Sequence, residues 1–200
     1  MRIILASRSP RRRECLRDLG LHFTAVDPGE DYAPEHAEVL TESQAAQFAL
    51  DAARHKGADV AHKHADALVI SADTIVFFGG RIYGKPKDAD DARKALRALY
   101  GRTHVVITAL ALFIDEERAS GYERTEVTFG ALSEAEETVF IKLAQVMDKA
   151  GSYAIQGVGG VLVTGVCGDY FNVVGMPVNL LDRLLKDAGL PGILELAKRE

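Results

Sequence analysis

Several features that mark other classes of protein are scarce in this sequence. Its 200 residues include no tryptophan and only two cysteines, Cys15 and Cys167. So few cysteines do not suit a disulfide-stabilised scaffold, and the two positions do not have the spacing of metal ligands. We therefore expect both cysteines to act as small apolar side chains in a reducing compartment.

Long apolar runs are absent as well. No run reaches the length of about 18 residues that a membrane-spanning helix needs, and the stretch Ile3–Ala6 is too short for a signal peptide. With 48% hydrophobic and 26% charged residues, the chain is too apolar to be intrinsically disordered. These features predict a globular cytoplasmic protein without a membrane partner, and the length predicts a single domain over residues 1–200.

Acidic residues outnumber basic ones overall, but positive charge is concentrated at one place. The formal net charge is −5, which argues against a nucleic-acid partner because nucleic-acid-binding domains are commonly basic. The first 17 residues, however, carry six arginines and one acid, a local charge of +5, so the remaining 183 residues sum to −10. This distribution favours a small, highly charged anionic ligand.

Apolar runs, capping residues and glycines predict an alternation of strands and helices. We expect strands at 2–6, 22–26, 67–72, 75–78, 81–83, 103–113, 122–129, 161–166 and 171–174. We expect helices at 10–19, 43–64, 88–100, from 133 onward and 177–188. Because strand–helix alternation is mixed with antiparallel pairs, the fold class is α/β with a mixed sheet, and this length suits two lobes flanking a cleft.

The segment Ser7–Arg12, with the sequence SRSPRR, lies between a buried strand and the start of a helix. Unpaired N–H groups at a helix N-terminus attract anions, and serine hydroxyls and arginine guanidinium groups would complete a phosphate site. The alternative is an exposed basic helix start or a basic sorting patch, and the segment alone leaves these interpretations open.

Three further polar residues follow apolar or glycine-rich segments. Asp73 ends the run ALVISA, and a carboxylate at the carboxyl end of a strand can hold Mg²⁺ or accept a proton from water. Lys85 precedes a proline that restricts its backbone, and Gln156 stands among glycines where its amide can contact a base edge. Taken singly, each is better explained without a function, as an Asx turn, a solvated lysine and an ordinary turn, respectively.

Motifs of several other chemistries are missing. His55, His62 and His64 have no neighbouring cysteine and form no HExxH, so a zinc site is disfavoured. The sequence also has no GxSxG nucleophile elbow and no P-loop.

Five segments in order resemble the Maf family of nucleoside triphosphate pyrophosphatases. They are LASRSPRRREC at 5–15, SADT at 71–74, GKPKDADDA at 84–92, DKAGSYAIQGVGG at 148–160 and GDYFNVVGMP at 168–177. The resemblance implies an inosine triphosphatase-like fold, which is a mixed, elongated sheet with flanking helices and two lobes around a cleft. It also implies hydrolysis of a nucleoside triphosphate, an acid anhydride, to the monophosphate and pyrophosphate.

The resemblance assigns roles to individual residues. Asp73 matches the general base. Phosphate-binding positions match Ser7, Arg11, Arg12, Lys85 and Lys56, although His55 aligns nearly as well as Lys56. Arg12, Thr74 and Gln156 fit the branch that acts on dTTP, UTP and modified pyrimidine nucleotides.

The resemblance further implies a divalent cation, Mg²⁺ or Mn²⁺, held by Asp73. Members commonly carry an acidic pair after the second strand, where this chain has Asp31 beside Glu30, and a glutamate where it has Gln145. The expected metal ligands are therefore Asp73 with Asp31 or Asp148.

Two other functions stay open at this point. One is a nucleotide-binding regulator of cell division or septum formation with little turnover, and the other is the same hydrolysis acting on 7-methyl-GTP. A homodimer is implied by the resemblance alone.

Overall fold

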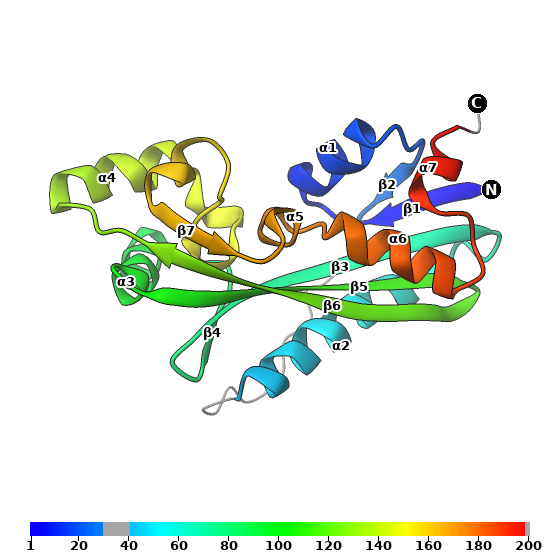
Figure 1. The fold of residues 1–200 in the computed structure, drawn as a ribbon, viewed down its shortest axis with the longest axis horizontal. Helices are drawn as coiled ribbons and strands as arrows, with labels where there is room; N and C mark the ends of the chain where they lie inside the picture. Colours follow the sequence, from blue (N-terminus) through cyan, green and yellow to red (C-terminus); the bar gives the residue numbers. More distant parts are fainter. Residues whose placement is uncertain (30–40, 199–200) are drawn as a thin grey trace.

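A mixed sheet of seven strands runs the length of the computed structural model, which describes residues 1–29 and 41–198 (Figure 1). The strands are β1 (Arg2–Ala6), β2 (Thr24–Val26), β3 (Ala67–Phe78), β4 (Arg81–Tyr83), β5 (Thr103–Ile114), β6 (Glu116–Phe129) and β7 (Val163–Cys167). They are ordered β2-β1-β3-β5-β6-β7, and β4 pairs with β3. The pairs of β1 with β2 and β3 are parallel, and the others are antiparallel.

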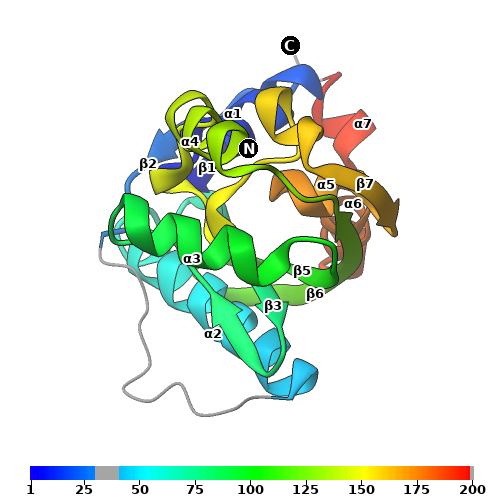
Figure 2. The ribbon, with the colours of Figure 1, turned by 90° about the vertical axis from the view of Figure 1, so that its left-hand side faces the viewer.

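Helices cover both faces of this sheet. They are α1 (Pro10–Asp18), α2 (Glu42–Ala61), α3 (Ala89–Leu99), α4 (Glu134–Leu143), α5 (Tyr170–Val174), α6 (Val178–Asp187) and α7 (Ile193–Leu196), with short 3₁₀ turns η1 (Val146–Asp148), η2 (Ala150–Ser152) and η3 (Gly157–Val161). Viewed from the end that carries α3, the long helix α2 lies on the opposite side of the strands from α5 and α6 (Figure 2).

Alternating residues of β3 enter different cores, as the pleat of a strand requires. Leu68 and Ile70 pack with α1 and α6, whereas Val69 and Ile75 pack with the alanine-rich face of α2. The third core lies near the other end of the sheet, between α3, α4 and the 3₁₀ turns. The two faces of β3 therefore meet different helices.

One edge of β3 has a gap between two neighbouring strands. β1 ends where Ala6 pairs with Ser71, and β4 begins to pair at Val76. On its other edge β3 pairs with β5 without interruption from Val69 to Phe77. The residues between Ser71 and Val76 are thus held rigidly by β5 while their other edge is open to ligands.

Most of the expected elements are confirmed, with ends that shift by a few residues. Asp88 caps α3, Ser133 and Glu136 form the expected capping box, and Gly79 and Gly80 have the positive φ angles of a tight hairpin. Among the described residues, no helix has the length and apolar character needed to cross a membrane.

Three expectations were wrong. The runs 67–72 and 75–78 form one strand, so Asp73 lies inside β3 and does not end it. Residues 171–174 form helix α5 because the Asp169 side chain caps it and Gly175 ends it with a φ of 103°. Cys15 is buried as expected, and burial raises the pKa of its thiol to about 11, but Cys167 is exposed at the end of β7.

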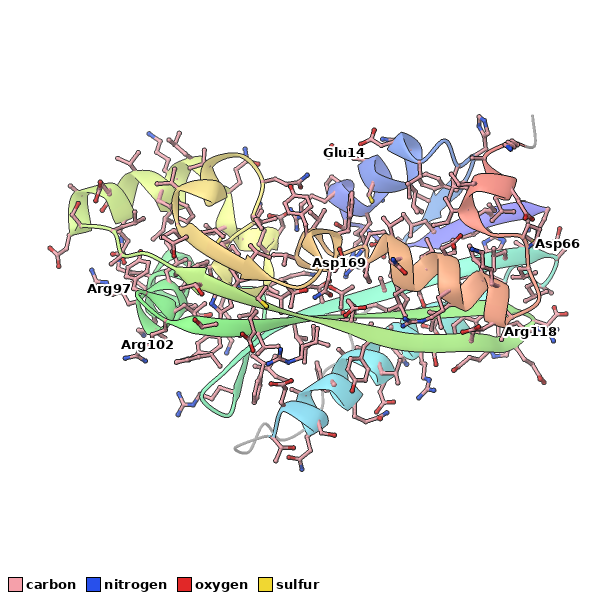
Figure 3. The ribbon with its side chains drawn as sticks, in the orientation of Figure 1. Glu14, Asp66, Arg97, Arg102, Arg118 and Asp169 are labelled. Atoms are coloured by element: carbon pink, nitrogen blue, oxygen red, sulfur yellow. The ribbon has the colours of Figure 1, made fainter. Side chains whose placement is uncertain are left out.

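A buried carboxylate joins α4 to α3. Glu137, whose side chain is 2% exposed, accepts hydrogen bonds from Arg93, Arg97 and Tyr100. Arg97 lies at the end of the molecule that carries α3 and α4 (Figure 3). Burial opposes ionisation of Glu137, but the hydrogen bonds and charges of its partners outweigh burial and hold its pKa below the usual value.

We expect Glu137→Gln to lower the free energy of unfolding by about 2 kcal/mol at pH 7, because it removes the buried charge that two arginines face. The stabilisation exists above the unfolded-state pKa of about 4.3 and disappears as the pH falls through the lower folded-state pKa. Urea denaturation of both proteins at several pH values from 7 down to about 3 measures it. Glu134→Gln, an exposed position on the same helix, is the control, and an equal loss there would contradict the assignment.

Candidate active site

A pocket of about 750 Å³ lies at the open edge of β3. Its wall includes part of the β1–α1 loop, the start of α1, Asp73 and Thr74 of β3, Lys56 of α2, and residues near η1–η3. The site residues expected from the sequence that line it are Ser7, Arg11, Arg12, Lys56, Asp73, Thr74, Lys85, Asp148 and Gln156. Asp31, the other expected metal ligand, lies outside the described residues.

The β1–α1 loop supplies one wall of the pocket. Ser9 is the N-cap of α1 and Pro10 follows it, but the Ser9 side chain forms no capping hydrogen bond. The Ser9 N–H is instead bonded to the hydroxyl of Ser7, 3.2 Å away. The start of α1 therefore faces the pocket with the positive end of the helix dipole, as an anion site requires.

Arg12 is buried and ties three segments together. Its Nε donates to the carbonyl of Gly175 (2.8 Å), and one terminal nitrogen donates to the carbonyl of Ala72 (2.9 Å) and the hydroxyl of Ser7 (3.2 Å). The other donates to the hydroxyl of Thr74, 2.8 Å away. Arg12 thus joins α1 to β3 and to the end of α5, and most of its N–H groups donate to oxygen atoms of the protein.

Asp73 and Lys56 form an ion pair on the opposite face of β3. The Lys56 nitrogen lies 2.6 Å from a carboxylate oxygen of Asp73, and their side chains are 10% and 15% exposed. The small residues of α2 allow this contact: a Cβ at Gly57 would lie 2.6 Å from the hydroxyl of Ser71, so the helix lies close to the sheet. Lys56 enters the pocket, whereas His55 is exposed and is not among the residues that line it.

Asp148 links the two sides of the pocket. It forms ion pairs with Arg11 of α1, at 3.3 Å, and with Lys149. Burial opposes the charge of Asp148, but Lys149 and Arg11 hold its pKa below the usual value. Asp148 therefore stays ionised at neutral pH and offers oxygen atoms that face the pocket.

Glycines allow close backbone packing in the segment that carries Gln156. A Cβ at Gly159 would overlap the carbonyl of Ala154, and Gly151, with a φ of 66°, donates its N–H to the carbonyl of Gly84 at 3.1 Å. This last contact joins the segment to the loop that carries Lys85. Gln156 itself is exposed, so its amide is accessible to a ligand.

Sequence reasoning missed a buried aromatic group under the pocket. Tyr153 lines the pocket, and its hydroxyl lies 2.8 Å from Nε2 of His104, which packs edge-on against Phe129. Burial lowers the pKa of His104 to about 4, so its ring is neutral at pH 7. Tyr153 belongs to the quoted 148–160 segment and could have been singled out there, but no pattern pointed to His104.

Among the described residues, the pocket lining combines positive charge with two carboxylates, Asp73 and Asp148. Among residues 1–29 and 41–198, no three histidine, cysteine or acidic side chains converge as a ready-made metal site. Mg²⁺ commonly takes only one or two protein carboxylates and completes its shell with water and substrate phosphates. Asp73 and Asp148 therefore suit a divalent cation that enters with a phosphorylated ligand.

Comparison with known proteins gives a consistent result. A sequence model of the family described as "Maf-like protein" matches residues 2–188. A protein of Deinococcus radiodurans named "dTTP/UTP pyrophosphatase" is 46% identical over 189 residues, which cover 94% of each chain. Proteins with the same name from Bacillus cytotoxicus and Myxococcus xanthus are both 44% identical, covering 92% and 94% of this chain and 94% and 93% of their own lengths.

We expect Arg12→Lys to lower the free energy of unfolding by about 2–3 kcal/mol, because a single ammonium cannot reach acceptors on three segments and leaves buried carbonyl groups unpaired. Thermal and urea unfolding measure the change. Arg17→Lys, an exposed position on the same helix, should change stability by less than about 0.5 kcal/mol. Equal stability of the Arg12 variant and wild type would show that the guanidinium contacts are not structural.

Proposed function

The chain belongs to the Maf-like protein family, and from this premise we propose that it hydrolyses dTTP and UTP, together with modified pyrimidine nucleotides, to the monophosphate and pyrophosphate. The observation that carries the proposal is that every described residue expected at the site lines the same pocket. The names of the matched relatives support the same reaction and substrates.

Positive charge along the pocket suits a triphosphate. Arg8, Arg11, Lys56 and Lys85 all line it, next to the N-terminus of α1. Cations and N–H groups placed before the reaction stabilise the negative charge that develops as a phosphate anhydride breaks, and no reorganisation is needed. Ser7, Arg11, Arg12, Lys56 and Lys85 are the proposed phosphate contacts, and Arg12 also donates a hydrogen bond to the hydroxyl of Ser7.

Asp73 is the proposed general base. Its carboxylate would accept a proton from the water that attacks the α-phosphorus, which releases pyrophosphate as the leaving group. Lys56, at 2.6 Å, fixes the carboxylate at the open edge of β3. A base positioned in this way also aligns the water for attack.

We propose that a divalent cation, Mg²⁺ or Mn²⁺, binds with the substrate. Asp73 and either Asp148 or Asp31 would hold it, and when bound it supplies positive charge that neutralises phosphate oxygens. Arg11 and Lys149 both contact Asp148, so these cations would compete with the metal for its oxygens.

Arg12, Thr74 and Gln156 are the proposed specificity residues. The Gln156 amide carries N–H groups that can donate to the O4 of a uracil or thymine base. Several other features stay predictions from the sequence and the resemblance. They are a single domain with an inosine triphosphatase-like fold and two lobes around a cleft, a cytoplasmic location and a homodimer.

A panel of nucleoside triphosphates with Mg²⁺, scored by pyrophosphate release, tests the reaction and its substrates. We expect turnover of dTTP and UTP above all others. Turnover of 7-methyl-GTP alone would move the specificity to a methylated purine. Nucleotide binding without turnover would favour a regulator of division or septum formation.

We expect Asp73→Asn to reduce kcat by at least about 1,000-fold while nucleotide affinity stays within about tenfold, because the amide cannot accept the proton but keeps the shape of the side chain. Steady-state kinetics and calorimetric titration measure the two quantities. Asp66→Asn, in the loop before the same strand and at the far end of the molecule (Figure 3), is the matched control. Retained turnover in the Asp73 variant would contradict the assignment of the base.

Removal of divalent cations should abolish turnover, because the pocket's own cations leave part of the phosphate charge unmatched. Dialysis against a chelator followed by addition of Mg²⁺ or Mn²⁺ should restore it, and the pyrophosphate assay measures both steps. Full activity in the presence of excess chelator would contradict the metal dependence.

A further inference from the structure

A chain of buried polar side chains leads from the pocket along one face of the sheet. It begins at Arg12 and Thr74 and continues through Thr108 of β5 to Asn172 of α5. Thr108 and Asn172 are fully buried. Buried polar groups must be hydrogen-bonded, so each member constrains the proton positions of the next.

The orientation of Asn172 is fixed by the backbone of β5. Its side-chain oxygen accepts from the N–H of Thr108 at 2.9 Å, and its side-chain nitrogen donates to the carbonyl of Val106 at 3.0 Å. The backbone carbonyl of Asn172 lies 2.8 Å from the hydroxyl of Thr108. A carbonyl oxygen can only accept, so the single hydroxyl proton of Thr108 is committed to Asn172.

The proton of Thr74 is thereby fixed as well. The hydroxyl oxygens of Thr74 and Thr108 are 3.0 Å apart, and because the Thr108 proton is already used, Thr74 must be the donor. An arginine nitrogen can only donate, so Thr74 accepts from Arg12 at 2.8 Å. A hydroxyl has one proton and two lone pairs, which leaves Thr74 one lone pair and no proton.

The remaining lone pair has room to meet a ligand. Thr74 is only partly buried and lines the pocket. The adjacent Gly175 has a φ of 103°, and a Cβ there would lie 3.1 Å from the hydroxyl oxygen of Thr74. A side chain at Gly175 would crowd this oxygen, so the glycine leaves space next to it.

We propose that Thr108 and Asn172 are positioning residues that make Thr74 an obligatory hydrogen-bond acceptor for the N3–H of a uracil or thymine base. Cytosine has a lone pair at its N3, which would face the lone pair of Thr74 without a proton between them. The inference rests on the proposed function and explains in atomic terms how the site would select pyrimidines that carry an imide N–H.

The first test uses the unchanged protein with Mg²⁺ and measures kcat/KM for UTP, CTP and 3-methyl-UTP, in which a methyl group replaces the N3–H. We expect CTP and 3-methyl-UTP to react at least about 100-fold less efficiently than UTP, because a site built to bond an N–H rejects analogues without it. Equal rates for UTP and 3-methyl-UTP would overturn the inference but leave the proposed hydrolysis intact. Absence of turnover with every triphosphate would overturn both.

The second test changes the chain of hydrogen bonds outside the pocket. Thr108→Val removes the acceptor of the Thr74 proton, which can then turn toward the ligand and donate to N3 of cytosine. We expect the ratio of kcat/KM for CTP to that for UTP to rise about tenfold, the equivalent of about 1.4 kcal/mol. Thr108→Ser keeps the hydroxyl and should restore the wild-type ratio.

A matched control separates this effect from lost stability. Thr103 and Thr128 form an exposed hydroxyl pair between β5 and β6, 2.9 Å apart, and Thr103→Val should leave both rates unchanged. A melting curve shows that each variant is folded under the assay conditions. If Thr108→Val lowers kcat/KM for UTP and CTP by the same factor, Thr108 has only a structural role and the inference fails.

Discussion

The continuous pairing of β3 with β5 is the constraint on which the pocket depends. The pairing of β3 with β1 ends at Ser71 and its pairing with β4 begins at Val76. The residues between them would be a flexible break if β5 did not hold them from the other edge. Backbone hydrogen bonds to β5 make this segment as rigid as the interior of a strand. Its unpaired edge leaves it as accessible as a loop. Catalytic and binding groups need both properties, because small displacements are costly and ligands must still reach them.

The same segment also explains why adjacent residues can have separate tasks. Successive side chains of a strand point to opposite faces, so Asp73 meets Lys56 of α2 while Thr74 meets Arg12 of α1. Burial of the Arg12 charge is tolerated because carbonyl and hydroxyl oxygens surround it. The proposed chemistry and the proposed base recognition thus depend on different supporting helices, although their residues are neighbours in the chain.

Much of this could be predicted from the sequence, and the failures have physical causes. Caps such as Asp88 and Ser133 act locally, so the helices they begin were predicted correctly. Asp73 was expected to end a strand because aspartate favours turns, but pairing with β5 overrides that preference. Residues 171–174 are rich in residues typical of strands, yet the Asp169 cap makes them helical. The contact of Thr108 with Asn172 joins residues 64 positions apart, and no local pattern encodes it.

Residues that contact a ligand directly are easier to recognise in a sequence than the residues that orient them. Thr74 and Gln156 stand in motifs that can be read as ligand contacts, but a threonine hydroxyl can donate or accept, so its identity alone does not say which base it selects. In this structure the choice is made by a backbone carbonyl of α5, two hydrogen bonds away from the pocket. Under the proposed base recognition, the length and position of α5, fixed by Asp169 and Gly175, are therefore determinants of specificity. A change of substrate preference can arise there without any change in the residues that touch the nucleotide.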